Sequence, residues 1–540
     1  MGTDAAWHAA NGLKPSRQRP PLPVEGPQTI KELLERWVLE RPDAPALVGR
    51  HGRYSYRELD AAVARAASAM HDLGLRAPDR IAACLPNDVD IVIAFLASQR
   101  LGLVWVGVNR LLAAAEKIHL LRDCGARAYL VSRELAAEIE DQREAVPELE
   151  RLLRVDPEAP ACEWRRLLDR VEGASAPEVD IDPFAASAIA YTSGTTGFPK
   201  GAVHSQHNLL LPGAVASMRK DRPRPDRHGV VLPMTILNLI VLGPLYVLYD
   251  GRCLVAMDRT DALGVAAWVR EERIGAFDGV PTIIHDLLTH PEVTPADLET
   301  LKAPGMGGAD TPPELAGLYR ERFGAQVIVG YGMTEAPTAV AWTDGTAPPT
   351  PGLCGRPVAQ VEIEILDERG ALVAPGEVGE ICVRAARKGE FAGVYTPMLG
   401  YWRNPEATAK VLVEGRYHTG DLGFLASDGN LHIRGRRNEL ILRGGANVYP
   451  AEVERVLGLH PEVEAAAVFG LPDPRLGERV VAVVQPRAGA SPDEGTLKQH
   501  VGGQLARYKV PEAVRFVDEM PRNAMNKIVK ARLRPLFDET

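Results

Sequence analysis

Cysteine and unbroken hydrophobic stretches are both scarce in this 540-residue sequence. The six cysteines lie far apart and form no Cys-x-x-Cys pair, which argues against a zinc site or a disulfide framework and fits a reducing compartment. The longest apolar run, Ile236 to Tyr249, contains Asn238 and Pro244 and is too short to span a bilayer. Residues Met1 to Pro23 lack the apolar stretch of a signal peptide. We therefore expect a cytoplasmic protein without a transmembrane segment.

An excess of positive charge is also missing. The formal net charge is −9, and a nucleic-acid partner usually demands a basic face, so no such partner is expected. A composition of 46% hydrophobic and 25% charged residues is typical of a soluble globular protein. The length exceeds what one ordinary core supports, which predicts at least two domains.

Helical and strand patterns alternate along most of the chain, which predicts a layered α/β fold with a largely parallel sheet. Tyr56 to Leu73 has helical spacing, for example, and Arg80 to Leu85 reads as a short buried strand. Between Val358 and Val383 short β-rich runs indicate a small barrel-like subdomain. After Gly435 a compact α+β pattern follows. The expected division is an irregular proline-rich arm over residues 1–27, a large domain over 28–436 and a small domain over 437–540.

The most informative segment runs from Tyr191 to Gly201 and reads Tyr-Thr-Ser-Gly-Thr-Thr-Gly-Phe-Pro-Lys-Gly. Glycines let backbone N–H groups approach an anion, hydroxyl side chains add donors, and Lys200 adds a cation. The spacing is not that of a Walker loop. Apolar residues Ala188 to Ala190 indicate a buried strand that leads into the segment. The pattern is typical of a polyphosphate-binding loop.

This segment resembles the phosphate loop of the adenylate-forming superfamily, which includes acyl-CoA synthetases, adenylation domains and beetle luciferases. Further motifs of that superfamily follow in order and extend the resemblance from about Thr29 to Arg534. They are Gly307-Gly308-Ala309, Tyr331-Gly332-Met333-Thr334-Glu335, Gly355-Arg356-Pro357, Gly400-Tyr401-Trp402, Thr419-Gly420-Asp421, Gly435-Arg436 and Lys527.

The resemblance implies an ATP-dependent acid:CoA ligase. A carboxylic acid would react with ATP to give an acyl-AMP intermediate and pyrophosphate, and CoA would then take the acyl group and release AMP. Because both first reactants are anions, catalysis would consist mainly of positioning and electrostatic stabilisation. Mg²⁺ is the implied cofactor, ATP and CoA are co-substrates, and a homodimer is kept as a candidate oligomeric state.

The resemblance also assigns residue roles. Lys527, Thr334 and Glu335 would be catalytic: the Lys527 ammonium would meet charge at the α-phosphate, and Glu335 would be the Mg²⁺ ligand. Asp421 and Arg436 would contact the ribose. The full set of ATP-binding residues is Thr192, Ser193, Gly194, Thr195, Thr196, Gly197, Lys200, Gly308, Ala309, Tyr331, Gly332, Asp421 and Arg436.

The acid and CoA end departs more from the superfamily pattern. Ile236 stands where many relatives carry His, and with Gly307, Gly444 and Gly445 it is expected to line the acid and CoA pocket. The apolar surroundings of Ile236 favour a hydrophobic acid: fatty, aromatic or alicyclic. Asn438 occupies the usual position of an Asp or Lys hinge residue, and Asn526 replaces the Gly that normally precedes the lysine.

Two alternatives stay open. Adenylation could be followed by transfer to a carrier-protein thiol or another non-CoA acceptor. The chain could also be a non-catalytic nucleotide-binding relative, which the replacements Ile236, Asn438 and Asn526 would favour. His204 and His207 are expected to be structural.

Overall fold

The computed structural model describes residues 2–15, 20–22, 25–159, 162–171, 173, 175–192, 199–218, 224–302, 304–307, 313–346, 350, 352–443, 446–523 and 527–537. The chain divides into a large unit, Met1–Ile363 with Val383–His418, and a small unit, Glu364–Cys382 with Thr419–Thr540. The expected mixed α/β fold with a large N-terminal and a smaller C-terminal part is confirmed. The boundary at residues 436 and 437 stays a prediction.

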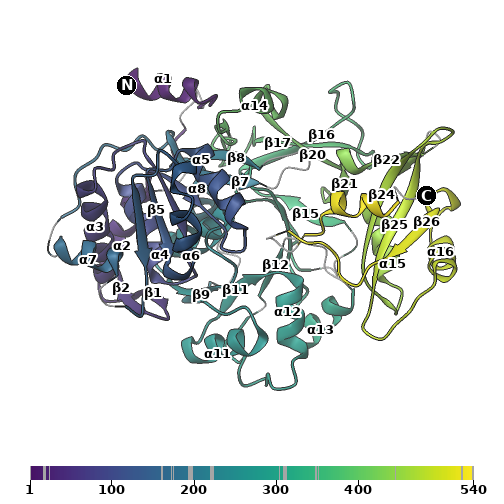
Figure 1. Ribbon diagram of the computed structural model, residues 1–540, viewed down its shortest axis with the longest axis horizontal. Coiled ribbons are helices and arrows are strands. Elements are labelled where there is room, and N and C mark those ends of the chain that lie inside the picture. Colours follow the sequence, from purple (N-terminus) through teal and green to yellow (C-terminus); the bar gives the residue numbers. More distant parts are fainter. Residues whose placement is uncertain are drawn as a thin grey trace. The chain divides into compact units, whose positions relative to one another are not determined.

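One seven-stranded sheet of the large unit contains the two strands, β7 and β8, that flank the predicted phosphate loop (Figure 1). Its central strands are parallel, as the alternating pattern predicts, and β7 and β8 form an antiparallel hairpin. The strands β3, β5 and β7 are mostly buried, which explains why they read as short apolar runs. In spatial order the strands are β18 (Gly400–Tyr401), β8 (Lys200–Ser205), β7 (Ala186–Thr192), β4 (Val104–Gly107), β3 (Arg80–Cys84), β5 (Ala128–Ser132) and β6 (Arg151–Val155).

Two neighbouring helices of the large unit begin at strong caps. Ser55 and Glu58 form a capping box at the start of α3 (Tyr56–Asp72). The Asp88 carboxylate accepts a hydrogen bond from the backbone N–H of Val89 at the start of α4 (Val89–Arg100).

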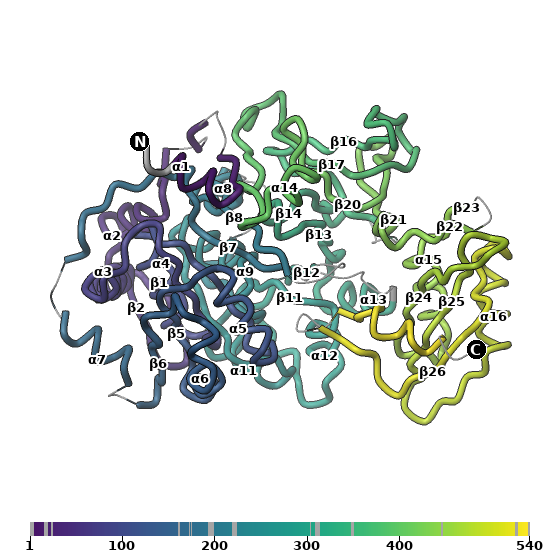
Figure 2. The backbone as a smooth tube through the Cα atoms, turned by 45° about the horizontal axis from the view of Figure 1, so that its top comes forward, coloured from purple at the N-terminus to yellow at the C-terminus, as the bar shows by residue number. Residues whose placement is uncertain are grey.

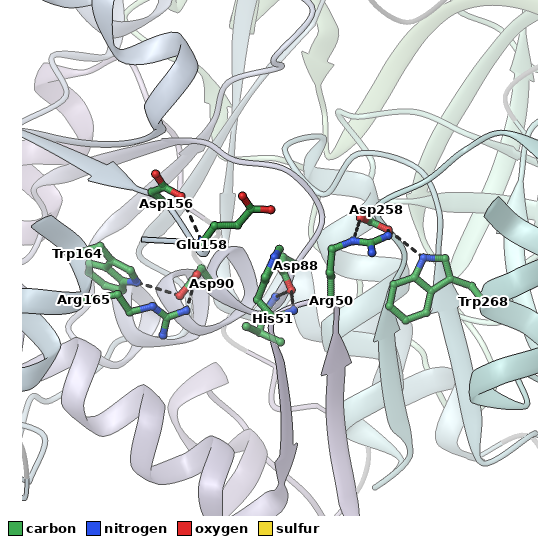
Figure 3. Close-up of polar contacts among 11 residues, drawn as sticks. Arg50, His51, Asp88, Asp90, Asp156, Glu158, Trp164, Arg165, Asp258 and Trp268 are labelled. Atoms are coloured by element: carbon green, nitrogen blue, oxygen red, sulfur yellow. Dashed lines mark hydrogen bonds and ion pairs between the residues drawn. The ribbon is translucent and has the colours of Figure 1, made fainter. Parts of the chain in front are cut away.

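A buried carboxylate joins α4 to a helix further along the chain. Figure 3 shows that Asp90 accepts hydrogen bonds from Trp164 and Arg165, at 3.1 and 3.0 Å. These bonds pair a carboxylate that is almost wholly buried, and they hold α7 (Glu163–Arg170) beside α4.

A second run of strands in the large unit is also largely parallel, with antiparallel pairs at its two ends. Its core lies around Val255, Val265 and Phe277. The order is β15 (Leu353–Pro357), β14 (Ala339–Trp342), β13 (Val329–Gly332), β12 (Gly305–Gly307), β11 (Ala276–Gly279), β9 (Arg227–Val230), β10 (Cys253–Ala256), β1 (Pro45–Gly49) and β2 (Gly52–Ser55).

The small unit contains a five-stranded sheet with a core of its own. Val453, Val468, Val480 and Val484 are fully buried in that core. The strands are β23 (Ala446–Val448), β22 (Ile441–Arg443), β25 (Gly477–Pro486), β24 (Val463–Asp473) and β26 (Ala513–Phe516), with β26 parallel to β25.

The helices α15 (Pro450–Gly458) and α16 (Glu494–Gly502) belong to the same unit and bury Val453 and Leu497 in its core. The alternation of short strands and helices that the sequence predicts after Gly435 is therefore confirmed. The strands β20 (Arg416–Leu425) and β21 (Leu431–Arg436) form an antiparallel pair just before this alternation begins.

The N-terminal residues differ from the expected irregular arm. Gly2–Ala10 forms helix α1, which is purple in Figures 1 and 2. The prolines that suggested irregular backbone begin only at Pro15, so the preceding alanine-rich residues are free to form a helix.

The β-rich run expected near Val358 to Val383 is present as β16 (Val361–Leu366) and β17 (Gly379–Ala385).

No helix among the described residues combines the length and hydropathy needed to cross a bilayer. The remaining strands are β16 (Val361–Leu366), β17 (Gly379–Ala385) and β19 (Leu412–Val413), and the remaining α-helices are α2 (Glu35–Glu40), α5 (Ala114–Cys124), α6 (Arg133–Glu140), α8 (Gln206–Met218), α9 (Leu237–Ile240), α10 (Tyr246–Tyr249), α11 (Ala262–Glu272), α12 (Pro281–Thr289), α13 (Pro313–Phe323) and α14 (Pro405–Val411).

Candidate active site

The β7–β8 hairpin positions the two ends of the predicted phosphate loop. Thr192, the last residue of β7, faces Lys200, the first residue of β8, and its hydroxyl donates to the Lys200 carbonyl at 3.4 Å. The buried strand that the sequence predicts before the loop is present as β7. The loop residues Ser193, Gly194, Thr195, Thr196 and Gly197 lie outside the described residues.

Tyr401 brings three separate motifs together. It lies on β18, which pairs with β8 so that Tyr401 faces Ala202. Its hydroxyl donates to Glu335 Oε1 at 2.9 Å, and the Lys200 ammonium lies 5.2 Å from the centre of its ring. Tyr401 belongs to the motif Gly400-Tyr401-Trp402, whose sequence alone indicates no role for its side chain. The structure places it between the predicted phosphate-binding cation and the predicted metal ligand.

A second phenol, that of Tyr417, lies near enough to Glu335 to be affected by its charge. Burial raises the pKa of Tyr417, and the negative charge of Glu335 raises it further, as do the neighbouring Tyr401 and Tyr331. Tyr417 therefore stays protonated at neutral pH. Neutral hydroxyl groups beside an anionic carboxylate can donate to it without adding repulsion.

The segment from Tyr331 to Glu335 follows a tightly packed strand. A Cβ at Gly332 would lie 2.0 Å from the carbonyl oxygen of Thr338, so β13 and β14 approach here at a distance that excludes a side chain. The Met333 N–H donates to the same carbonyl at 3.0 Å. This contact fixes where the chain leaves β13, immediately before Thr334 and Glu335.

His204 is tied to this segment through the backbone. Its Nε2–H donates to the carbonyl oxygen of Thr334 at 2.9 Å, from a fully buried position on β8. Burial lowers the pKa of His204 to about 4, so the ring is neutral at physiological pH. His207 instead bonds the carbonyl of Val394 and stacks on Phe184, which is a structural arrangement. The structure thus gives His204 a place beside the site that its local sequence pattern did not indicate.

Two of the predicted acid-pocket residues, Ile236 and Gly307, lie at different elements of the large unit. Ile236 is half-buried at the start of α9, and a Cβ on Gly107 would meet the carbonyl of the preceding Thr235 at 2.0 Å. This segment therefore packs closely on the carboxyl end of β4. Gly307 ends β12, beside Gly330 of β13. Outside the described residues lie Gly308, Ala309, Gly444 and Gly445.

The small unit brings the two predicted ribose-contacting residues together. Asp421 and Arg436 face each other across the β20–β21 pair, and Arg436 Nε lies 2.7 Å from Asp421 Oδ1. The Asp421 side chain is 3% exposed, whereas that of Arg436 is half exposed. A buried carboxylate held by an adjacent guanidinium is oriented to accept hydrogen bonds.

Lys527 is hydrogen-bonded to Asn523 in the same unit. Asn523 N–H donates to the Lys527 carbonyl at 2.8 Å, and Lys527 N–H donates back to Asn523 Oδ1 at 3.0 Å. Lys527 is exposed, and Asn526 lies outside the described residues. The predicted hinge residue, Asn438, lies in the 3-10 turn Arg437–Glu439.

Lys530 links the Lys527 segment to this turn. Its ammonium lies 2.6 Å from Glu439 Oε2 and 2.8 Å from Glu454 Oε1. Burial opposes the charge, but Glu454 and Glu439 together raise the pKa of Lys530. The segment that carries Lys527 is therefore anchored beside the predicted hinge.

The donor set of the large unit suits a magnesium–polyphosphate group. Glu335 supplies hard carboxylate oxygen, which Mg²⁺ prefers, and Lys200 supplies a positive charge close by. Tyr401 contacts both side chains and so links them.

Comparisons with known proteins match nearly the whole chain. The profile of the AMP-binding enzyme family matches residues 34–402, and that of the AMP-binding enzyme C-terminal domain matches residues 452–527. A feruloyl-CoA synthase from an Amycolatopsis species is 35% identical over 511 residues, which cover 93% of this chain and 99% of the relative.

Solved structures of related enzymes also match nearly the whole chain. The anthranilate CoA ligase AuaEII, in complex with anthranoyl-AMP, has a TM-score of 0.83 at 25% identity over 94% of this chain and 97% of that one. The amide bond synthetase McbA from Marinactinospora thermotolerans has a TM-score of 0.81 at 29% identity, over 94% of this chain and 100% of that one. The chain belongs to the AMP-binding enzyme family, within the acid:CoA ligase branch of the adenylate-forming superfamily.

Proposed function

We propose that this protein is an ATP-dependent acid:CoA ligase that activates a hydrophobic carboxylic acid through an acyl-AMP intermediate. The observation that carries the proposal is the position of Tyr401, whose hydroxyl bonds Glu335 and whose ring lies beside Lys200, because it joins three motifs of the family at one side chain. Such an arrangement suits a polyphosphate with its counter-ion, because a carboxylate can hold the cation and an ammonium can offset phosphate charge.

In the first half-reaction a carboxylate oxygen of the acid attacks the α-phosphorus of ATP. The bond from that phosphorus to the pyrophosphate oxygen breaks, and pyrophosphate leaves. Lys200 would offset charge on the leaving phosphates, and Lys527 would offset charge on the α-phosphate and the attacking acid. Thr334 would donate its hydroxyl to the α-phosphate.

Glu335 would hold Mg²⁺, which when bound neutralises charge on the phosphate oxygens. The Tyr401 hydroxyl fixes the plane of the Glu335 carboxylate through Oε1. The Thr334 backbone, held by His204, fixes where the Glu335 side chain begins. These contacts preorganise the carboxylate before a nucleotide arrives, which is the condition under which an electrostatic group is most effective.

In the second half-reaction the CoA sulfur attacks the carbonyl carbon of the acyl adenylate. AMP leaves, the thiol proton is released, and a thioester remains. We propose that the small domain moves between the two steps about Asn438. Asp421 and Arg436 would hold the ribose, Tyr331 would lie against adenine, and the path of the CoA thiol would be lined by Gly444 and Gly445.

Among the hydrophobic acids, we propose an aromatic acid as the first choice of substrate, ahead of an alicyclic or a fatty acid. Ile236 and the buried Leu237 give an apolar character to the segment that packs against the end of β4. The relatives named above act, by their names, on ferulate and anthranilate, both aromatic acids. The cytoplasm is the proposed location, and the six free, buried cysteine thiols support a reducing compartment.

The test is acid-dependent exchange of labelled pyrophosphate into ATP, followed by AMP formation when CoA is added. The panel should contain ferulic, benzoic and cyclohexane carboxylic acids, a fatty acid series and acetate. We expect exchange with one or more hydrophobic acids and CoA-dependent release of AMP. Exchange with no acid would overturn the proposal, and nucleotide binding by calorimetry without exchange would support a non-catalytic relative.

A second candidate keeps adenylation and changes the acceptor. The likeness to an amide bond synthetase at 29% identity supports an amine as the acceptor in this second candidate. Hydroxylamine trapping of the acyl adenylate with no stimulation of AMP release by CoA would support this candidate. Strong stimulation by CoA would exclude it.

A further inference from the structure

The N-terminal segment from Trp7 to Lys14 packs directly behind the strand that carries Tyr401. The Trp7 and Trp402 rings lie 5.5 Å apart. Leu13 is 4% exposed and belongs to the same core as Val203 and Leu399. One face of the segment is thus packed against the core of the large unit.

Backbone hydrogen bonds from the segment bracket β18 at both ends. Lys14 N–H donates to the Leu399 carbonyl at 2.6 Å, and Arg403 N–H donates to the Asn11 carbonyl at 3.0 Å. Leu399 N–H donates to the carbonyl of Val203 on β8 at 2.8 Å. Strand β18 is the last strand of its sheet, so it is paired with β8 on one side and held by the N-terminal segment at its two ends.

Two glycines allow the N-terminal segment and β18 to approach each other closely. Gly12 has φ +71°, and a Cβ there would lie 3.1 Å from Pro405 Cδ. A Cβ at Gly400, immediately before Tyr401, would lie 2.9 Å from Thr408 Cγ2 and 3.3 Å from the Gly12 carbonyl. A side chain would clash at Gly400 and would be crowded at Gly12, where the backbone angle also favours glycine, so the path of the segment and the path of β18 depend on each other.

The same segment also contacts the strand that leads into the phosphate loop. His8 is 4% exposed, and its Nε2 accepts a hydrogen bond from the N–H of Ala186, the first residue of β7, at 3.0 Å. One short segment therefore holds both β18, which supplies Tyr401, and β7, which leads into the loop.

We infer that residues 7–14 are a positioning element for the adenylation step, acting through Tyr401 on Glu335. The inference rests on the role proposed for Glu335. If the segment only added stability, its loss would lower the melting temperature and leave the magnesium and ATP dependence of the folded enzyme unchanged. If it positions Tyr401, its loss would raise the KM for Mg-ATP and lower kcat in pyrophosphate exchange.

The experiment is a double-mutant cycle in the full-length protein between Trp7→Ala and Tyr401→Phe. We expect Trp7→Ala alone to lower kcat/KM for Mg-ATP about 10-fold, since small misplacements of reacting groups carry large costs. In the Tyr401→Phe background the same change should have an effect of less than about 2-fold, because the two residues act in one chain of contacts. Trp7→Phe should restore most of the activity.

Trp37→Ala is the matched control. Trp37 is also a half-buried tryptophan on a short N-terminal helix, and it packs near Tyr56, at 6.3 Å between rings. We expect this variant to lose thermal stability with an unchanged KM for Mg-ATP.

Additive effects of Trp7→Ala and Tyr401→Phe would overturn the inference, as would an unchanged KM in folded Trp7→Ala. Should Trp7→Ala fail to fold, Gly12→Ala takes its place in the cycle, because it displaces the segment without removing apolar area. A wild-type protein inactive with every acid would instead count against the proposed function.

Discussion

Among single residues, the Tyr401 hydroxyl offers the most direct test of the candidate site. Tyr401→Phe removes the hydrogen bond to Glu335 and keeps the ring beside Lys200. A hydrogen bond to a charged group contributes about 1.5–3 kcal/mol, so we expect a loss of about 10-fold or more in pyrophosphate exchange. The exchange rate is measured as a function of Mg²⁺ concentration, and we expect the variant to need a higher Mg²⁺ concentration for half-maximal exchange.

Tyr395→Phe serves as the control for that change. Tyr395 is buried, and its hydroxyl has no hydrogen-bond partner within the described part of the chain. Removing an unpaired buried hydroxyl should leave exchange unchanged and cost no stability. Equal losses in the two variants would mean that the Tyr401–Glu335 bond does not serve the reaction.

His204 predicts a pH dependence of stability. Its pKa is about 4 in the folded state against an ordinary value of 6.5, so the unfolded chain binds more protons between these values. The contribution of His204 to the free energy of unfolding is therefore fully present above the unfolded-state pKa and falls as the pH drops from 6.5 towards 4. Between about pH 7.5 and about pH 5 the loss from this one group is about 2 kcal/mol.

The variant that tests this is His204→Gln, which keeps an N–H donor for the Thr334 carbonyl and cannot titrate. Urea denaturation at both pH values should show a smaller pH effect in the variant than in the wild type. An identical pH effect in both proteins would show that His204 does not carry it.

Among the secondary-structure elements, β13 and β14 pack so closely at Gly332 that no side chain fits between them. Gly332→Ala would place a Cβ 2.0 Å from the Thr338 carbonyl oxygen, where only backbone could move. We expect a loss of about 1–3 kcal/mol in stability together with loss of exchange activity, because Thr334 and Glu335 leave the strand at this point.

Gly317→Ala is the matched control for the glycine change. Gly317 lies inside helix α13, and a Cβ there would meet nothing within 4 Å. Replacing an unstrained helical glycine should raise stability by about 0.5–1 kcal/mol and leave activity unchanged. Thermal denaturation of both variants measures the contrast. A folded, active Gly332→Ala protein would contradict the packing argument.

The elements themselves were largely predictable from the sequence, because local patterns set them. The buried run Ala188–Ala190 forms the middle of β7, and the helical spacing after Tyr56 corresponds to α3. The helix α1 was missed because the proline-based expectation for the arm was extended to residues that contain no proline. A local pattern also cannot show what a segment packs against.

The contacts of the site were less predictable. Tyr401 and Glu335 lie 66 residues apart in the sequence, and β18 pairs with β8, a strand from the first half of the chain. No local signal fixes such a register. The motifs indicated which residues matter, whereas the Tyr401 contact, the His204 bond and the N-terminal segment required the three-dimensional arrangement.

At the scale of the whole molecule, a variant of Lys527 tests whether adenylation and thioester formation depend on different residues. Lys527→Ala removes the ammonium proposed to meet charge at the α-phosphate, so adenylation should fall by about 10²–10³, the scale of one preorganised electrostatic group. Thioester formation from supplied acyl-AMP needs no charge at that position and should change much less. Both rates are measured on the same preparation, with Lys530→Arg as a control that keeps the pairs with Glu439 and Glu454. Equal losses in the two steps would show that Lys527 serves the fold of the small domain rather than the first reaction, and the proposed division of labour between the domains would fail with it.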